Sequence, residues 1–206
     1  MDQGAVNSQP AFFSSAVAAR AMPGEYVSGD LSIVVPVVGG ALVAVIDGLG
    51  HGMEAAAAAA AARDTVRNCA GEPIEVVMEH CHNALRGTRG AVMTLAQIDQ
   101  QRDELTWVGV GNVEGRIWPA LPGATLNRQA PPLRGGVVGH ALPKLRSSTL
   151  TLSRGDLLIL STDGVSNNFH EEFMLNGPVQ QIADDIMDKH WTGKDDGLIL
   201  VARYLG

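Results

Sequence analysis

The chain has 206 residues, of which 46% are hydrophobic, and this is enough apolar material for one substantial core. We expect a single domain over 1–206, with its core between about 16 and 205, because no Ser/Gly-rich or charged linker divides the sequence. The net charge of −7 argues against a nucleic-acid-binding protein, which needs a basic face, and suits a protein that collects divalent cations.

The sequence also indicates the cellular compartment of the protein. Its first residues lack the basic start and continuous apolar run of a signal peptide. The longest apolar run, Ala55–Ala62, is too short and too weakly hydrophobic to span a bilayer. Cys69 and Cys81 are the only cysteines and do not make a disulfide framework, which favours a reducing compartment. We therefore expect a soluble cytoplasmic protein that makes no membrane contact.

Strands are predicted at the start of the chain. A first strand is expected over 14–22, followed by apolar runs over 31–38 and 41–47. The Gly-Gly pair between these two runs is typical of a β-hairpin with a two-residue turn. Pro36 cannot donate a backbone hydrogen bond, so its strand is predicted to lie at a sheet edge or to contain a bulge.

Two helices are predicted to follow the hairpin. The first begins near Glu54 and continues through the alanine run, whose small side chains allow a helix to lie close to a sheet. Pro73 opens the second helix. Its apolar residues recur at helical spacing: Ile74, Val77, Met78, Cys81 and Leu85. His80 and His82 lie about 200° apart on such a helix and cannot hold one ion together, so a core cysteine between surface histidines is the simpler interpretation.

The second half of the chain is predicted to be mainly strands. The expected elements are strands at 91–99, 104–112 and 113–120, an irregular Gly- and Pro-rich segment at 122–144, a helix at 178–190 and a final strand at 196–206. We also expect 145–152 and 156–164 to pair with each other around a Ser-Arg-Gly turn. This order favours antiparallel sheets with helices outside them over an alternating parallel sheet.

Aspartates recur beside glycines near the ends of apolar strands. Asp47 and Asp163 each follow an apolar run, Asp195 precedes one, and Asp30 lies in the earlier turn "SGD". A buried carboxylate there is costly unless a cation or several donors accompany it. At any one of these positions an ordinary Asp-Gly turn is the simpler interpretation. Together, the four positions favour a single site.

The ligand chemistry of such a site predicts its metal. Carboxylates and backbone carbonyls without cysteine or histidine favour hard cations such as Mg²⁺ or Mn²⁺. A pair of these ions can clamp a phosphoryl group during in-line attack by water. The aspartates therefore indicate metal-assisted hydrolysis of a phosphoester.

The ordered motifs resemble those of a known family. "SGD", "DGLGHG", "RGAVMTLAQID", "VGVGNVEGRIW", "GDLLILSTDG" and "KDDG" follow one another as in metal-dependent PPM/PP2C-type serine/threonine phosphatases. The likeness covers roughly residues 16–205 and is strongest to the bacterial branch that contains RsbX, SpoIIE and RsbU, with RsbX-like enzymes fitting best. It implies an α+β fold, an αββα sandwich of two antiparallel β-sheets flanked by helices, with a dimetal centre of Mn²⁺ or Mg²⁺ between the sheets.

The resemblance also implies roles for particular residues. Asp47 would bridge both metals, and the carbonyl of Gly48 would bind one of them. Asp163 and Asp195 would hold the other metal, while Asp30 would serve the first, directly or through water. The implied metal positions are Asp30, Asp47, Gly48, Asp163 and Asp195, and the implied catalytic residues are Asp47, Asp163 and Asp195.

The sequence departs from the larger family at several positions. Eukaryotic relatives have a histidine directly after the Asp-Gly pair that corresponds to Asp47 and Gly48. This chain has a leucine there, and His51 follows two residues later. His51 is a proton donor, a supporting group or a merely exposed side chain, and Arg20 is either a phosphate-binding group or an ordinary surface charge. Asn112 is a turn residue or orders the site. Asp196 falls where the family often has Asn, so it ranks below Asp195.

The resemblance implies a substrate as well. RsbX-like enzymes dephosphorylate serine or threonine on STAS-domain proteins of the stressosome, RsbS and RsbR, and so reset stress signalling. Phosphorylated proteins of that type are therefore the expected partners.

Two other functions remain open from the sequence. "DGLGHG" also resembles the Asp-x-Gly-x-Gly turn of GHKL-type ATP-binding kinases, which should have an earlier helix with a magnesium-binding Glu/Asn motif. The third alternative is a catalytically weak module that only binds phosphorylated proteins.

Overall fold

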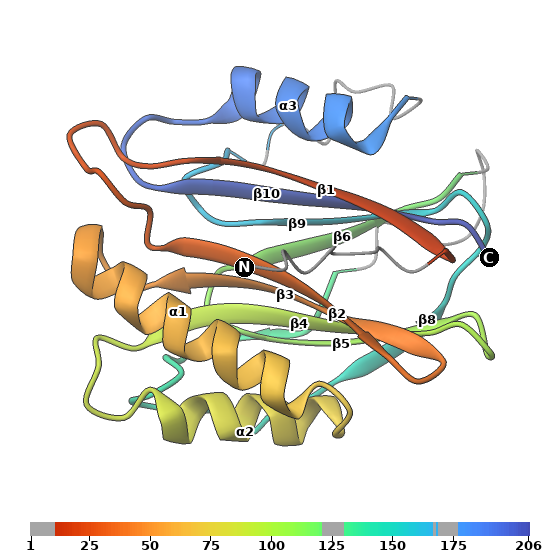
Figure 1. The fold of residues 1–206 in the computed structure, drawn as a ribbon, viewed down its shortest axis with the longest axis horizontal. Coiled ribbons are helices and arrows are strands. Elements are labelled where there is room, and N and C mark those ends of the chain that lie inside the picture. Colours follow the sequence, from red (N-terminus) through yellow and green to blue (C-terminus); the bar gives the residue numbers. More distant parts are fainter. Residues whose placement is uncertain (1–10, 121–129, 167, 169–176) are drawn as a thin grey trace, which may run out of the picture.

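The protein is a four-layered sandwich in the computed structural model, which describes residues 11–120, 130–166, 168 and 177–206. Two mainly antiparallel sheets pack face to face (Figure 1). Helix α3, Val179–His190, covers the outer face of the smaller sheet. Helices α1, Gly52–Cys69, and α2, Ile74–Ala84, cover the outer face of the larger sheet. The predicted αββα architecture is confirmed.

The smaller sheet contains the first and the last of the described strands, β1 and β10. Its strand order is β1-β10-β9-β6 within the described residues. The strands are β1, Phe13–Arg20; β6, Glu114–Trp118; β9, Leu157–Ser161; and β10, Gly197–Tyr204. Strands β9 and β10 are buried along almost their whole length because they are central in the sheet and covered on both faces.

The larger sheet has the order β2-β3-β4-β5-β7, with β8 also paired to β5. Its strands are β2, Asp30–Val37; β3, Gly40–Gly48; β4, Ala91–Asp99; β5, Glu104–Val110; β7, Leu133–Arg134; and β8, Ser148–Thr151. The predicted β2–β3 hairpin is present, and β2 is an edge strand, which accounts for Pro36.

The alanine run sets how closely α1 approaches the larger sheet. Ala55, Ala58, Ala59 and Ala62 have no exposed surface and pack in one cluster with residues of β3 and β4 or against the strand ends. Because alanine adds little bulk, the helix axis lies near the strands that carry the first two aspartate motifs. The predicted apolar face of α2 is also confirmed, since Ile74, Val77, Met78, Cys81 and Leu85 are all buried.

Three apolar layers fill the sandwich, as four stacked layers require. The central layer, between the sheets, contains Trp107, whose side chain is 1% exposed and whose Nε1 donates to Ser148 Oγ over 2.7 Å. Truncating such a buried indole typically costs about 3–5 kcal/mol of stability. The other two layers lie between each sheet and its helices.

One predicted pairing is wrong. Strands β8 and β9 do not pair with each other, because β8 pairs with β5 and β9 pairs with β10 and β6. The intervening residues pass from the larger to the smaller sheet. At this corner the buried carboxylate of Asp156 accepts the N–H groups of Ser153 and Ala120 at 2.8 and 2.9 Å. The alternating pattern of each strand is the same whichever sheet it joins, so the pattern could not reveal the crossing.

The segment predicted to be irregular is described only in part, since residues 121–129 lie outside the described residues. After that point the chain contains the short β7 and a bridge between Ala91 and Val138. No helix in the described part of the chain is long and apolar enough to cross a membrane.

Candidate metal centre

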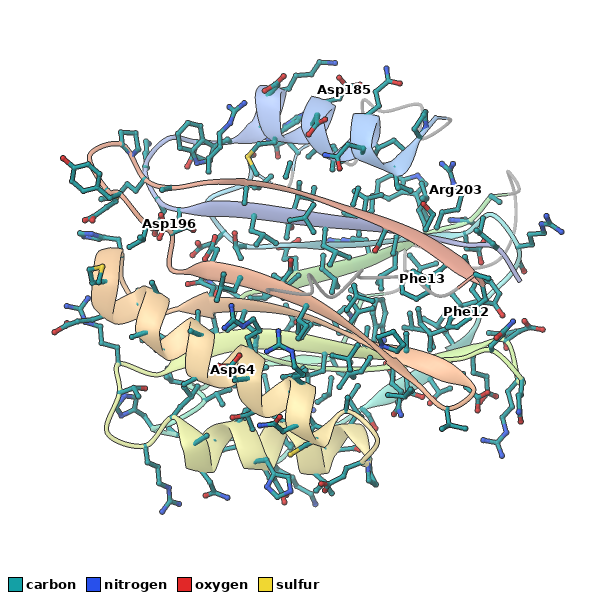
Figure 2. All side chains as sticks on the ribbon, in the orientation of Figure 1. Phe12, Phe13, Asp64, Asp185, Asp196 and Arg203 are labelled. Atoms are coloured by element: carbon teal, nitrogen blue, oxygen red, sulfur yellow. The ribbon has the colours of Figure 1, made fainter. Side chains whose placement is uncertain are left out.

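The aspartate motifs meet at one end of the sandwich. In Figure 2, Asp196 lies at the end where β1 connects to β2 and where α1 begins, while Phe12 and Phe13 lie at the other end. Strands β2, β3, β9 and β10 all have a motif at this end, because antiparallel neighbours alternate in direction and each motif follows or precedes its strand accordingly.

Asp30 and Asp47 are cross-strand neighbours. They face each other in the register of β2 and β3, which places their Cβ atoms about 4.5–5.5 Å apart. Asp30 is 3% exposed, and its Oδ2 accepts a hydrogen bond from Thr162 Oγ1 over 2.7 Å. Thr162 is itself oriented by the N–H of Leu198, which donates to Oγ1 over 2.9 Å. The smaller sheet therefore positions a carboxylate of the larger sheet.

Gly48 is held against the first turn of α1. Its N–H donates to the carbonyl of Gly29 over 3.0 Å. A Cβ atom at Gly48 would lie 2.2 Å from the carbonyl oxygen of Ala55, so no side chain fits there. Glycine is thus required by the close approach of helix and strand, and its own carbonyl remains at the metal-facing end of β3.

The third and fourth motifs press against each other. A Cβ atom at Gly164 would lie 1.7 Å from the carbonyl oxygen of Asp196, so the "STDG" and "KDDG" turns are in backbone contact. Asp163 is exposed, and its Oδ2 accepts a hydrogen bond from Asn112 Nδ2 over 2.6 Å. Asn112 therefore orders the site, and this agrees with one of its two predicted roles.

The two adjacent aspartates of the last motif behave differently. Asp196 is 3% exposed, and its carboxylate accepts the N–H groups of Met22 and Gly29, each over 2.7 Å. It therefore fastens the β1–β2 connection to the start of β10. Asp195 is half-buried; its Oδ1 accepts the N–H of Asp196 over 2.8 Å, and its carbonyl accepts from Trp191 Nε1. Its other carboxylate oxygen is available as a ligand.

The carboxylates repel one another. Burial, opposed by the hydrogen bond from Thr162 and reinforced by the charges of Asp196, Asp163 and Asp195, raises the pKa of Asp30 to about 7. Burial, together with the charges of Asp30 and of the same three aspartates, raises the pKa of Asp47 to about 8. These charge effects, the register of β2 and β3 and the contact between the last two turns place the aspartate motifs at the same end of the sandwich.

Such a group of carboxylates fits divalent cations. Burial and the neighbouring negative charges raise the pKa values of Asp30 and Asp47, and a bound cation would offset both effects. The available donors are carboxylate oxygens and the Gly48 carbonyl, which suit Mg²⁺ or Mn²⁺ better than softer metals. Asp30, Asp47, Gly48, Asp163 and Asp195 could hold these ions.

The basic groups considered from the sequence lie in surface pairs. His51 Nδ1 is 2.6 Å from Glu25 Oε1, and the imidazole is 53% exposed. Arg20 forms an ion pair with Asp188 and lies over the ring of Trp191, with 5.2 Å between its Cζ and the ring centroid. These contacts agree with the interpretation of Arg20 as a surface charge. They leave the catalytic role of His51 a hypothesis.

Sequence reasoning missed Thr162 and the structural role of Asp196. Thr162 lies between a buried strand and Asp163, and a buried hydroxyl at that point needs a partner, which is the only signal the sequence offered. Asp196 was ranked by analogy with an asparagine, and its interaction with two backbone N–H groups follows from the loop conformation.

Comparison with known proteins identifies the family. The model of the family described as Stage II sporulation protein E (SpoIIE) matches residues 38–204. The chain belongs to the SpoIIE family. Its architecture is that of PP2C phosphatases, and it is a phosphoprotein phosphatase of this type.

Individual relatives agree with this placement. The phosphoserine phosphatase RsbX of Bacillus subtilis (strain 168) is 30% identical over 156 residues, which cover 75% of this chain and 76% of RsbX. A chain solved in work on the bacterial stressosome, as a modular system adapted to control secondary messenger signalling, is 28% identical with a TM-score of 0.85, covering 93% of this chain and 99% of that one. RsbX solved in complex with magnesium is 24% identical with a TM-score of 0.81, covering 96% and 98%.

Proposed function

We propose that the SpoIIE-family domain described here is an RsbX-like, Mn²⁺- or Mg²⁺-dependent protein serine/threonine phosphatase that acts in the cytoplasm. Its substrates would be phosphorylated STAS-domain stressosome proteins of the RsbS/RsbR type. The observation that carries the proposal is that Asp30, Asp47, Asp163 and Asp195 come from four separate strand ends at one end of the sandwich, and that no cationic side chain among the described residues lowers the pKa of Asp30 or Asp47. The 30% identity to RsbX supports the substrate class.

The proposed mechanism divides the work between metal and protein. Bound divalent ions would neutralise the phosphoryl oxygens and lower the pKa of the attacking water. Asp30, Asp47, the Gly48 carbonyl, Asp163 and Asp195 would hold these ions. Asp47, Asp163 and Asp195 are the catalytic residues of this proposal. Solvent would protonate the leaving serine or threonine oxygen in this proposal.

Other residues keep these ligands in place. Thr162 directs one oxygen of Asp30, so the other oxygen is free to face an ion. Asn112 does the same for Asp163. Asp196 fixes the connection that leads into Asp30, since it accepts the N–H of Gly29. Rigid ligands of this kind reduce the reorganisation needed when charge develops on the phosphoryl group.

The kinase alternative does not agree with the fold. Residues 11–47 contain the strands β1, β2 and most of β3 and no helix that could carry a magnesium-binding Glu/Asn motif. The module that only binds phosphoproteins shares the fold, and retention of every acidic position argues against it. Metal-dependent hydrolysis of p-nitrophenyl phosphate would separate an active enzyme from such a module.

The direct test uses phosphorylated partners. The protein would be incubated with phosphorylated RsbS- and RsbR-like STAS-domain proteins, with Mn²⁺ or with chelator, and the released phosphate would be measured. We expect release only with metal. Release of phosphate in chelator would refute the metal-dependent mechanism, while hydrolysis of p-nitrophenyl phosphate without release from the STAS proteins would refute the substrate class alone.

A further inference from the structure

A second group of potential metal ligands lies at the other end of α1. The Cys69 thiol, the Glu72 carboxylate and the His80 imidazole offer ligand atoms that all lie within 4.8 Å of one another. Helix α1 runs from Gly52 to Cys69, so at 1.5 Å per residue this group lies about 25 Å from the start of the helix, where the aspartates meet. The two groups are therefore separate.

We propose that Cys69, Glu72 and His80 form a binding site for a thiophilic divalent cation of the zinc class, with water as the fourth ligand. The site would link the end of α1 to α2.

The ligand types select this class of metal. A thiolate, an imidazole and a carboxylate are the side chains that bind Zn²⁺, whereas Mg²⁺ prefers oxygen ligands alone. Zn²⁺ bonds of about 2.0–2.3 Å to a tetrahedral set separate neighbouring ligand atoms by roughly 3.5 Å. His80 Nε2 and Glu72 Oε2 are already 3.2 Å apart. Small side-chain rotations are enough to complete the set.

The backbone makes the arrangement rigid. The N–H of Glu72 donates to the carbonyl of Cys69 over 3.0 Å, which fixes the turn between the helices. Ile74 and Met78 are buried against the larger sheet, so the face of α2 that carries His80 cannot rotate away. One ligand at the end of α1, one on the turn and one on α2 are thus presented together.

Metal binding at Cys69 requires loss of the thiol proton. Binding of Zn²⁺ would form a sulfur–metal bond and release that proton to the solvent. Cys81 cannot replace Cys69, because it is fully buried and its thiol donates to the carbonyl of Ala62.

A titration with Zn²⁺ tests the proposal. The full chain, kept in excess Mg²⁺ so that the aspartate centre is occupied, would be titrated calorimetrically, and Co²⁺ would serve as an optical probe of thiolate binding. We expect one Zn²⁺ site and a thiolate-to-cobalt absorption band. Cys69→Ser and His80→Gln should each lower Zn²⁺ affinity by at least about tenfold, and Cys69→Ser should also abolish the band.

Controls separate this site from the aspartate centre. Cys81→Ala should keep both the affinity and the band, although its smaller core side chain lowers stability. Asp47→Asn should leave the cobalt band unchanged, so the proposal can succeed or fail independently of the phosphatase mechanism. Zn²⁺ should raise the melting temperature of the wild-type chain and not that of Cys69→Ser. Equal Zn²⁺ affinity in wild type and Cys69→Ser, or no thiolate band, would reduce the group to a surface pair of His80 and Glu72.

Discussion

Two regions of this protein bury aspartates, and they do so in opposite ways. At the corner between β8 and β9, Asp156 is 2% exposed and accepts the N–H groups of Ser153 and Ala120. At the candidate metal centre Asp196 also accepts two backbone N–H groups, but Asp30 and Asp47 lie among further carboxylates, and Asp30 accepts a hydrogen bond from the hydroxyl of Thr162. Backbone donors stabilise the carboxylate of Asp156. The carboxylates of Asp30 and Asp47 would instead be stabilised by a bound cation.

The difference shows how a binding site can be told from a structural one. Burial alone does not distinguish them, because Asp156 is as buried as Asp30. The distinction lies in whether backbone donors or other negative groups surround the carboxylate. Removing Asp156 should therefore affect stability, and removing Asp47 should affect activity.

The largest expected effect belongs to Asp47. Asp47→Ala removes a proposed metal ligand and should lower phosphatase turnover by at least about 10³-fold, because bound metals supply several kcal/mol of transition-state stabilisation. The metal-free fold should remain, since the substitution relieves repulsion. Turnover on p-nitrophenyl phosphate with Mn²⁺ and a melting curve in chelator are the measurements. Turnover close to wild type would rule out the assignment of Asp47.

The matched change at the corner is Asp156→Ala. It leaves the part-buried backbone N–H groups of Ser153 and Ala120 without their acceptor, and we expect the free energy of unfolding to fall by about 1–3 kcal/mol. The fraction of Asp156→Ala that remains folded should show the same dependence of phosphatase turnover on Mn²⁺ concentration as the wild-type protein. Urea denaturation gives the first quantity and a metal titration the second. A shifted metal dependence would mean that the two regions are coupled.

The pH dependence of stability provides a third contrast. Asp30 and Asp47 have folded pKa values of about 7 and 8, above their ordinary value of 3.8. The folded state therefore retains protons that the unfolded state releases, and the metal-free protein should lose stability as pH rises from about 4 through 8. Urea denaturation in chelator across this range measures the slope. Asp47→Asn or added Mg²⁺ should flatten it, and an equal slope in Asp47→Asn would contradict this explanation.

The smallest expected effect belongs to Asn112. Asn112→Ala removes the donor that orients Asp163 and leaves the ligand itself, so turnover should fall by about 10- to 100-fold at limiting Mn²⁺. Saturating Mn²⁺ should restore part of the loss, which a metal titration of turnover would show. Asn112→Asp should not restore it, because a carboxylate there adds repulsion in place of a donor. A full recovery in that variant would show that the hydrogen bond has no role.

Local patterns were enough to predict most elements of the fold. Two apolar runs around a Gly-Gly turn located the β2–β3 hairpin, and Pro36 indicated an edge strand or a bulge, of which the structure has the edge strand. Pro73 and helical periodicity located α2 and its buried face. Each of these features is determined by residues that are close together in the sequence.

Features that depend on distant partners were predicted poorly. Whether β8 and β9 share a sheet is decided by β5 and β10, which lie far away in the sequence. The ordered motifs indicated that the aspartates converge, yet no local pattern predicted the contact between Thr162 and Asp30. Such contacts arise only when one sheet lies on the other.

The close packing around Gly48 limits which amino-acid substitutions this site tolerates. Every larger residue there would collide with the backbone of the helix that follows, whereas each aspartate has isosteres of similar shape. A library randomised over the whole end of the sandwich, and selected for folding alone, should therefore keep glycine at position 48 while the aspartates drift to asparagine. The most invariant position at this catalytic centre would then be the one that contributes no side chain.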